Sequence, residues 1–235
     1  MASNNTPTVP FLASRLKLRR AAKHIAELEV LAVEHIKMQR KSMPPPLEAP
    51  QFADAEGQIV FHGPMMLHGP PEDFGAIVGD VIHNLRAALD LLASDLVRKG
   101  GGNPNNVYFP FCDKPQDLQK VVKDRNFHRA GPKAIALLEE FKPYRGGNTA
   151  LRAIHDLDIQ DKHKTLIPAS AAVTTQAFSF VRIGGRLAAQ PVPNSGPNVG
   201  FVFPAGDVFA GKEIIPTLHE LLQLTSGIVE AFAAL

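Results

Sequence analysis

The sequence predicts an α+β protein, a helical bundle with long amphipathic helices and a small antiparallel β-meander packed against it. Two observations predict this class. Apolar residues recur at steps of three and four over several long stretches of the 235-residue chain, which is the periodicity of helices with one buried face. After residue 164 the composition shifts toward Val, Ile, Thr and Phe in short segments separated by Gly and Pro, which is typical of antiparallel strands.

Length and composition restrict the class of protein further. With 45% hydrophobic and 20% charged residues the chain can bury a core, and we expect a single domain, 1–235, with residues 1–8 as a flexible tail. No stretch approaches the roughly 20 apolar residues that span a bilayer, so no membrane partner is expected. Cations within the first 30 residues interrupt the apolar core of a secretory leader. The single cysteine excludes an internal disulfide, and we expect a cytoplasmic location.

The helices are bounded by proline and glycine. Three prolines at 44–46 end the first helix, because proline lacks the backbone donor that a continuing helix needs. Three glycines at 100–102 end the long central helix. Proline opens two shorter helices, at a position where the missing donor has no intrahelical partner anyway. The predicted ranges are about 10–41, Glu72–Arg98, Pro115–Lys123, Pro132–Phe141, Asn148–Asp161 and Ile214–Ala234.

The strands are predicted mainly in a β-rich segment over 165–204. Residues 43–57 form a proline-rich connector, and Gln58–His62 after it is a further strand candidate. Val107–Phe111 is at best an edge strand, because Pro110 cannot donate to a ladder. The strands of the meander are expected within Thr165–Thr175, Ala177–Ile183 and Val199–Phe203.

A polar strip runs along the predicted central helix. At about 100° per residue His83, Arg86 and Asp90 fall in one sector, whereas the rest of the circumference is small or apolar. Arg86 and Asp90 have the four-residue spacing of an ion pair. Because an unpaired buried charge costs several kcal/mol, the strip requires a partner segment. Residues 151–164, the densest run of ionisable groups, are the best candidate.

Within this second segment Asp161 falls on the inward side with the apolar residues. An inward carboxylate would be explained if Asp161 accepted hydrogen bonds from Arg86, His83 or Lys162. We therefore predict a polar cluster where two helices cross. The candidate catalytic residues are His83, Arg86, Asp90, Asp161 and His163.

Two interpretations of this cluster remain open. It is either a chemical site or a structural network of salt bridges, and both predict the same contacts. They differ in solvent access, because a chemical site needs an opening and a histidine that titrates near neutrality. In the second case the protein is a non-catalytic module whose amphipathic helices bury against a protein partner or against a second copy in a homo-dimer.

Three sequence blocks resemble segments of a family of uncharacterised bacterial proteins: residues 79–90, 108–111 and 158–164. More distantly, the chain is similar to HEPN helical-bundle proteins, many of which are ribonucleases in toxin and antiphage systems. Their motif, arginine followed after four to six residues by histidine, occurs here at Arg19–His24. The resemblance implies a protein that binds or cleaves RNA, in which histidine moves a proton and arginine holds phosphate without a metal.

The sequence gives less support to other kinds of site. No cofactor or metal is expected, although His83, His155, His163 and Asp161 would supply zinc ligands if the two helices crossed suitably. Cys112 is expected to pack as a small apolar residue. The chain contains neither a Gly-x-Ser-x-Gly nor a phosphate-loop motif. The cations of the first helix, interrupted by glutamates, are either a solvated face or a phosphate contact surface.

Overall fold

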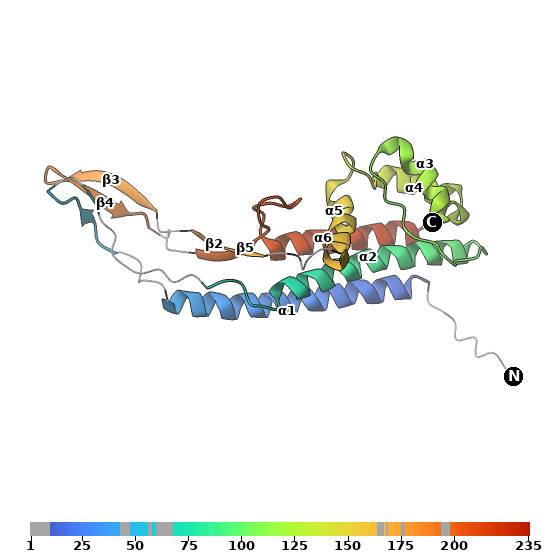
Figure 1. The fold of residues 1–235 in the computed structure, drawn as a ribbon, viewed down its shortest axis with the longest axis horizontal. Coiled ribbons are helices and arrows are strands. Elements are labelled where there is room, and N and C mark those ends of the chain that lie inside the picture. Colours follow the sequence, from blue (N-terminus) through green and yellow to red (C-terminus); the bar gives the residue numbers. More distant parts are fainter. Residues whose placement is uncertain are drawn as a thin grey trace. The chain divides into compact units, whose positions relative to one another are not determined.

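The apolar stripes of the sequence form helices with nearly the predicted bounds (Figure 1). The computed structural model describes residues 10–42, 48–55, 58–59, 68–163, 167, 169–174, 177–193 and 198–235. The predicted flexible tail and part of the proline-rich connector lie outside the described residues. The helices are α1 (Leu12–Ser42), α2 (Phe74–Lys99), α3 (Leu118–Asp124), α4 (Pro132–Phe141), α5 (Thr149–His163) and α6 (Ile214–Ala233), with short 3-10 helices η1 (Pro115–Asp117) and η2 (Phe127–Ala130).

The chain groups into two compact units. The helical unit contains the residues up to Leu28, then Asp73–Pro168 and Ile214–Leu235. The β-containing unit contains Glu29–Glu72 and Ala169–Glu213. Helix α1 runs through both units, so the expectation of a single domain stays a prediction.

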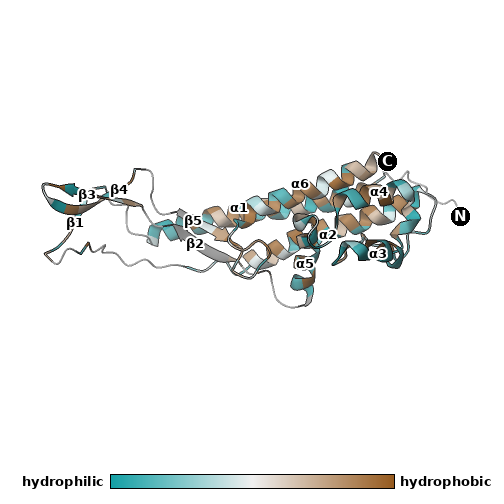
Figure 2. Cartoon of the chain, turned by 90° about the horizontal axis from the view of Figure 1, so that it is seen from above, coloured by the Kyte–Doolittle hydropathy of each residue, from teal (hydrophilic) through white to brown (hydrophobic). Residues whose placement is uncertain are grey.

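Helix α2 is the core of the helical unit. It contacts α5 and α6, and both views show α5 crossing the long helices of this unit (Figures 1 and 2). Residues on all sides of α2 are buried, among them Val78, Leu85, Ala88 and Val97, which confirms that this helix is covered around most of its circumference. Phe109, Phe127 and Phe232 add an aromatic cluster with edge-to-face ring contacts.

The strands of the β-containing unit form two small antiparallel sheets, which confirms the α+β class. In one sheet the order is β1 (Gln51–Phe52), β4 (Arg186–Pro191), β3 (Phe178–Ile183). In the other, β2 (Ser170–Thr174) pairs with β5 (Asn198–Val202). Gly184 and Gly185 have φ of 56° and 83° and form the two-residue turn between β3 and β4.

The strand order differs from a simple meander. Because β2 pairs with β5, the β3–β4 hairpin is an insertion between two partners that are distant in sequence. Val107–Phe111 forms no strand. The candidate at Gln58–His62 is wrong for Gln58 and Ile59, and the rest of it lies outside the described residues. The backbone N–H of Gln58 instead donates to Asp54 Oδ1 at 2.7 Å.

In the described part of the chain no helix combines the length and apolar character needed to span a membrane.

Candidate functional site

The polar strip of α2 meets α5 inside the helical unit, as the sequence predicts. His83 contacts Asp158, and Arg86 contacts His155. Each contact joins residues about 70 positions apart in the chain. The crossing of α2 and α5 therefore brings the two ionisable segments together, but it sorts them into two clusters with different solvent access.

The open cluster consists of His83, Asp158 and Lys162. Asp158 Oδ1 lies 3.1 Å from His83 Nδ1, and Asp158 Oδ2 accepts a hydrogen bond from Lys162 Nζ at 2.8 Å. The Asp158 side chain is 8% exposed, whereas the His83 side chain is 44% exposed. An ionised carboxylate only accepts, so the Nδ1 hydrogen of His83 faces Asp158 and the neutral ring keeps its lone pair on Nε2. A buried carboxylate thus orients a half-exposed imidazole.

The closed cluster is built around Arg86. Its guanidinium lies over the ring of Phe111 at 4.8 Å, and its Nη1 forms an ion pair with Asp90 at 2.5 Å. Its Nε donates to His155 Nδ1 at 3.4 Å, and the His155 ring stacks on Phe111. Arg86 is buried and contacts Asp90, Phe111 and His155, although its Nη1 lies within ion-pair distance of Asp90 without forming a hydrogen bond to any described residue. It is therefore a structural cation rather than one presented to solvent.

Asp90 links α2 to the loop that follows it. Its Oδ1 accepts the backbone N–H of Phe109 at 2.8 Å in addition to the ion pair with Arg86. This fixes the segment 108–111, whose Phe111 is the ring that both Arg86 and His155 contact. Asp90 therefore makes two contacts: it pairs with Arg86 one turn earlier on α2, and it anchors this loop.

A second buried arginine lies one turn before His155 on α5. Arg152 Nη1 donates to the carbonyl oxygen of Cys112 at 2.8 Å, and its Nε and Nη2 donate to Asp156 Oδ1 at 3.1 and 2.8 Å. Asp113 completes the network from the loop, and its pKa is held below the usual value by the hydrogen bond from Arg145 and by the charge of Arg152.

His155 is kept neutral by this environment. Burial, followed by the neighbouring guanidinium groups of Arg86 and Arg152, lowers its pKa from 6.5 to about 4. At neutral pH its Nδ1 accepts from Arg86 and its Nε2 carries the hydrogen. With so low a pKa, His155 does not gain or lose a proton near neutral pH, so it is unsuited to proton transfer there.

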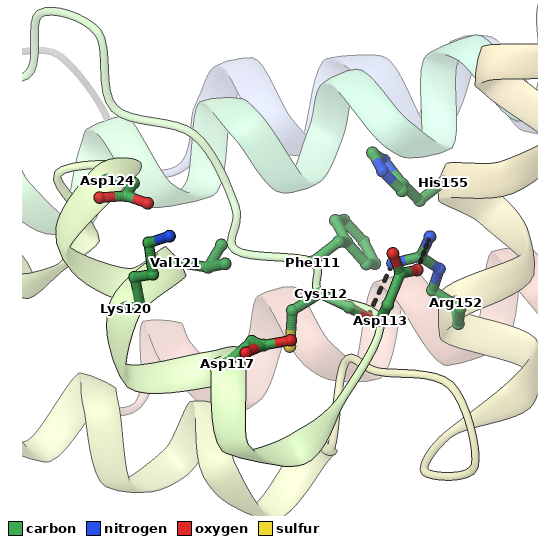
Figure 3. A pocket seen from close by; sticks show the side chains of 9 residues that line it. All are labelled: Phe111, Cys112, Asp113, Asp117, Lys120, Val121, Asp124, Arg152 and His155. Carbon is green, nitrogen blue, oxygen red and sulfur yellow. Dashed lines mark hydrogen bonds and ion pairs between the residues drawn. The ribbon is translucent and has the colours of Figure 1, made fainter.

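A pocket of about 370 Å³ opens beside the closed cluster (Figure 3). His155 and Arg152 lie at one end of it, and Lys120 and Asp124 at the other. Phe111, Cys112, Asp113, Asp117 and Val121 line the rest. Cys112 is buried, and burial raises the pKa of its thiol, so this sulfur packs as a small apolar group. His83 is not among the lining residues, and it lies on the surface outside this pocket.

The hydrogen bonds predicted for Asp161 are not present. Asp158, one turn earlier, takes the contacts from His83 and Lys162, and Asp161 Oδ1 is buried without a hydrogen-bond partner. The carboxylate lies against Gly79, where an added Cβ would come within 2.4 Å of Oδ1. Asp161 is thus inward as predicted, but a glycine of α2 accommodates it, and no described residue donates a hydrogen bond to its Oδ1.

Replacing Asp161 by Asn is expected to stabilise the protein at neutral pH by about 1 kcal/mol, because it removes a charge that is partly buried beside two other carboxylates. Burial, followed by the charges of Asp158 and Asp80, raises the pKa of Asp161. A raised carboxyl pKa costs stability above the ordinary value of 3.8 and costs nothing below it. Urea unfolding of both proteins at pH 7 and pH 3.5 measures this, and an equal gain at the two pH values would contradict the explanation.

Of the five predicted site residues, the structure places His83, Arg86 and Asp90 on α2 and Asp161 and His163 near the end of α5. The side chain of His163 lies outside the described residues, so its distance from His83 stays untested. Asp158 is not among the site residues that the sequence predicts. Two signals were present: Asp158 is four residues after the inward Ile154, and it is four residues before Lys162, the spacing of a helical ion pair.

No match identifies the chain. Neither a protein-family model nor a curated protein nor a solved structure matches it significantly. Within the described ranges, no three histidine, cysteine or acidic side chains converge closely enough to hold a metal ion. The function is therefore inferred from the geometry of the two clusters.

Proposed function

We propose that the protein is a cytoplasmic RNA-binding protein that cleaves RNA by general acid–base chemistry at His83. One observation carries the proposal: the imidazole of His83 is half exposed while its Nδ1 is held at 3.1 Å by the buried carboxylate of Asp158. This arrangement leaves Nε2 as an oriented base at the surface. The ammonium group of Lys162 on the other oxygen of Asp158 adds a cation near the place where phosphate charge would develop.

RNA suits this site because it carries its own nucleophile. In the proposed reaction Nε2 of His83 takes the proton of a ribose 2′-hydroxyl, whose oxygen attacks the adjacent phosphorus. The O2′–P bond forms, the P–O5′ bond breaks, and the departing O5′ receives a proton from the imidazolium. The products are a 2′,3′-cyclic phosphate and a 5′-hydroxyl. A polymer reaches a histidine on an open surface, whereas a small substrate requires enclosure such as the pocket beside His155 provides.

Replacing His83 by Gln is expected to lower the cleavage rate of a single-stranded RNA about a hundredfold, the lower range for the loss of a general base. Asp158→Asn is expected to retain RNA binding and to lower the rate less, with a shifted pH profile, because it acts by orienting His83. The assay uses a labelled 12-nucleotide RNA with EDTA present. The matched control is His128→Gln, which removes another exposed histidine of the helical unit. Equal rates for wild type and His83→Gln would refute the proposal.

A second candidate is a non-catalytic interaction or self-association module. The burial of Arg86 and Arg152 favours it, because these groups stabilise the α2–α5 crossing rather than face a substrate. Leu12 and Leu16 on the first turns of α1 are 42% and 48% exposed and would suit a protein partner. A concentration-dependent dimer by light scattering, lost in Leu12→Ser/Leu16→Ser, combined with no His83-dependent cleavage, would favour this module.

A further inference from the structure

The first half of α1 carries a concentration of positive charge within the helical unit. Arg15, Lys17, Arg19, Arg20 and Lys23 follow the start of the helix, and the first acidic residue of the helix is Glu27. This segment therefore presents several cations with no carboxylate among them over about three helical turns.

Not all of these cations are free to bind an anion. Arg15 is engaged by Glu230 of α6 through two hydrogen bonds, Nε to Oε1 at 2.9 Å and Nη2 to Oε2 at 2.8 Å. Arg19, Arg20 and Lys23 are exposed, and none of them forms an ion pair with a described residue. Lys17, Arg20 and Lys23 succeed one another at three-residue steps and form a diagonal row that rises about 4.5 Å per step.

This row begins beside the open cluster. Lys17 Nζ donates to Asn84 Oδ1 at 3.2 Å, and Asn84 is the residue next to His83 on α2. The first turns of α1 lie alongside α2 in this unit (Figure 1). Asp80 is exposed, and at about 100° per residue it falls between the directions of His83 and Asn84. The surface from Lys17 to Lys23 is thus basic, whereas the carboxylates of Asp80, Asp158 and Asp161 lie near its start at His83.

We propose that single-stranded RNA lies along this row, with its phosphates on Lys17, Arg20 and Lys23 and one ribose at His83. The inference rests on the proposed function and names the path of the substrate. The contacts are to phosphates, so the binding is independent of base sequence and strongly salt-dependent. The carboxylate of Asp80 is expected to weaken binding, because it repels the RNA phosphates near His83.

The test measures RNA binding in the full chain carrying His83→Gln, which prevents cleavage. Anisotropy of a labelled 12-nucleotide oligouridylate is followed between 50 and 300 mM salt. Adding Lys17→Gln, Arg20→Gln and Lys23→Gln is expected to weaken binding at least tenfold at 100 mM salt. The slope of log affinity against log salt should fall by about 2, since each single-strand phosphate contact contributes about 0.7. Asp80→Asn is expected to tighten binding about twofold.

The matched control removes the same charge elsewhere on the helical unit, with Lys120→Gln, Lys123→Gln and Lys133→Gln, three exposed lysines of α3 and α4. The proposal is overturned if the two triple variants bind alike, or if the α1 variant loses binding to vesicles of anionic phospholipid while RNA binding is unchanged. If cleavage depends on His83 but the α1 variant binds RNA as tightly as its parent, the proposed path is wrong and the proposed function stands. If only the α1 variant loses RNA binding and the wild type cleaves no RNA, the proposed function is wrong and the path stands.

Discussion

Replacing Arg152 by Met is expected to lower the free energy of unfolding by about 2 kcal/mol, because this buried guanidinium makes three hydrogen bonds and those of charged groups contribute about 1.5–3 kcal/mol. The guanidinium donates to the Cys112 carbonyl and to Asp156 and pairs with Asp113, and only 10% of the side chain is exposed. Methionine fills a similar volume but leaves the Asp156 carboxylate and the Cys112 carbonyl without this donor. Urea unfolding at pH 7 measures the loss.

Arg145 provides the matched control for this prediction. It contacts the same two carboxylates, Asp113 at 3.0 Å and Asp156 at 3.0 Å, but its side chain is 58% exposed. Because exposed ion pairs contribute about 0–1 kcal/mol, Arg145→Met should cost less than 1 kcal/mol. If both variants lost the same stability, burial of Arg152 would not be the cause.

The pH dependence of stability is expected to depend on His155. Its pKa is lowered in the folded protein to about 4, against 6.5 in the unfolded chain. The folded state disfavours the protonated ring of His155. The protein therefore keeps its full stability above pH 6.5 and loses stability as the pH falls toward 4. The pKa difference corresponds to about 3 kcal/mol, which partial exposure reduces to about 2 kcal/mol.

The measurement compares wild type with His155→Gln by chemical unfolding at pH 7, 5.5 and 4.5. Glutamine retains an oxygen that accepts from Arg86 Nε and has no charge to gain. The wild type should lose about 2 kcal/mol more than the variant over this range. The comparison between variants is necessary because Asp161, whose pKa is raised, has the opposite effect as the pH falls. An imidazole of His155 that titrates near 6.5 by NMR would contradict the prediction.

The candidate site shows what the apolar periodicity of a helix can and cannot predict. The periodicity of residues 151–164 identifies the inward side of α5, and both Asp158 and Asp161 lie near the apolar residues of that side. Which carboxylate meets His83 depends on the axial position of α5 against α2. That position is set by packing, and in particular by Gly79, whose missing side chain leaves room for Asp161. The pattern on one helix contains no information about the place on the other helix that it meets.

The sequence by itself determined the α+β class, the bounds of the helices to within a few residues, and the need for the polar strip of α2 to meet a charged segment. These follow from local rules, because periodicity, helix-ending residues and the cost of an unpaired buried charge act within single segments. Only the tertiary structure decided the pairing of β2 with β5, the separation of the polar residues into an open and a closed cluster, and the choice of Asp158 as the partner of His83. Each of these depends on how elements distant in sequence are aligned, and that alignment is set by the packing of whole surfaces.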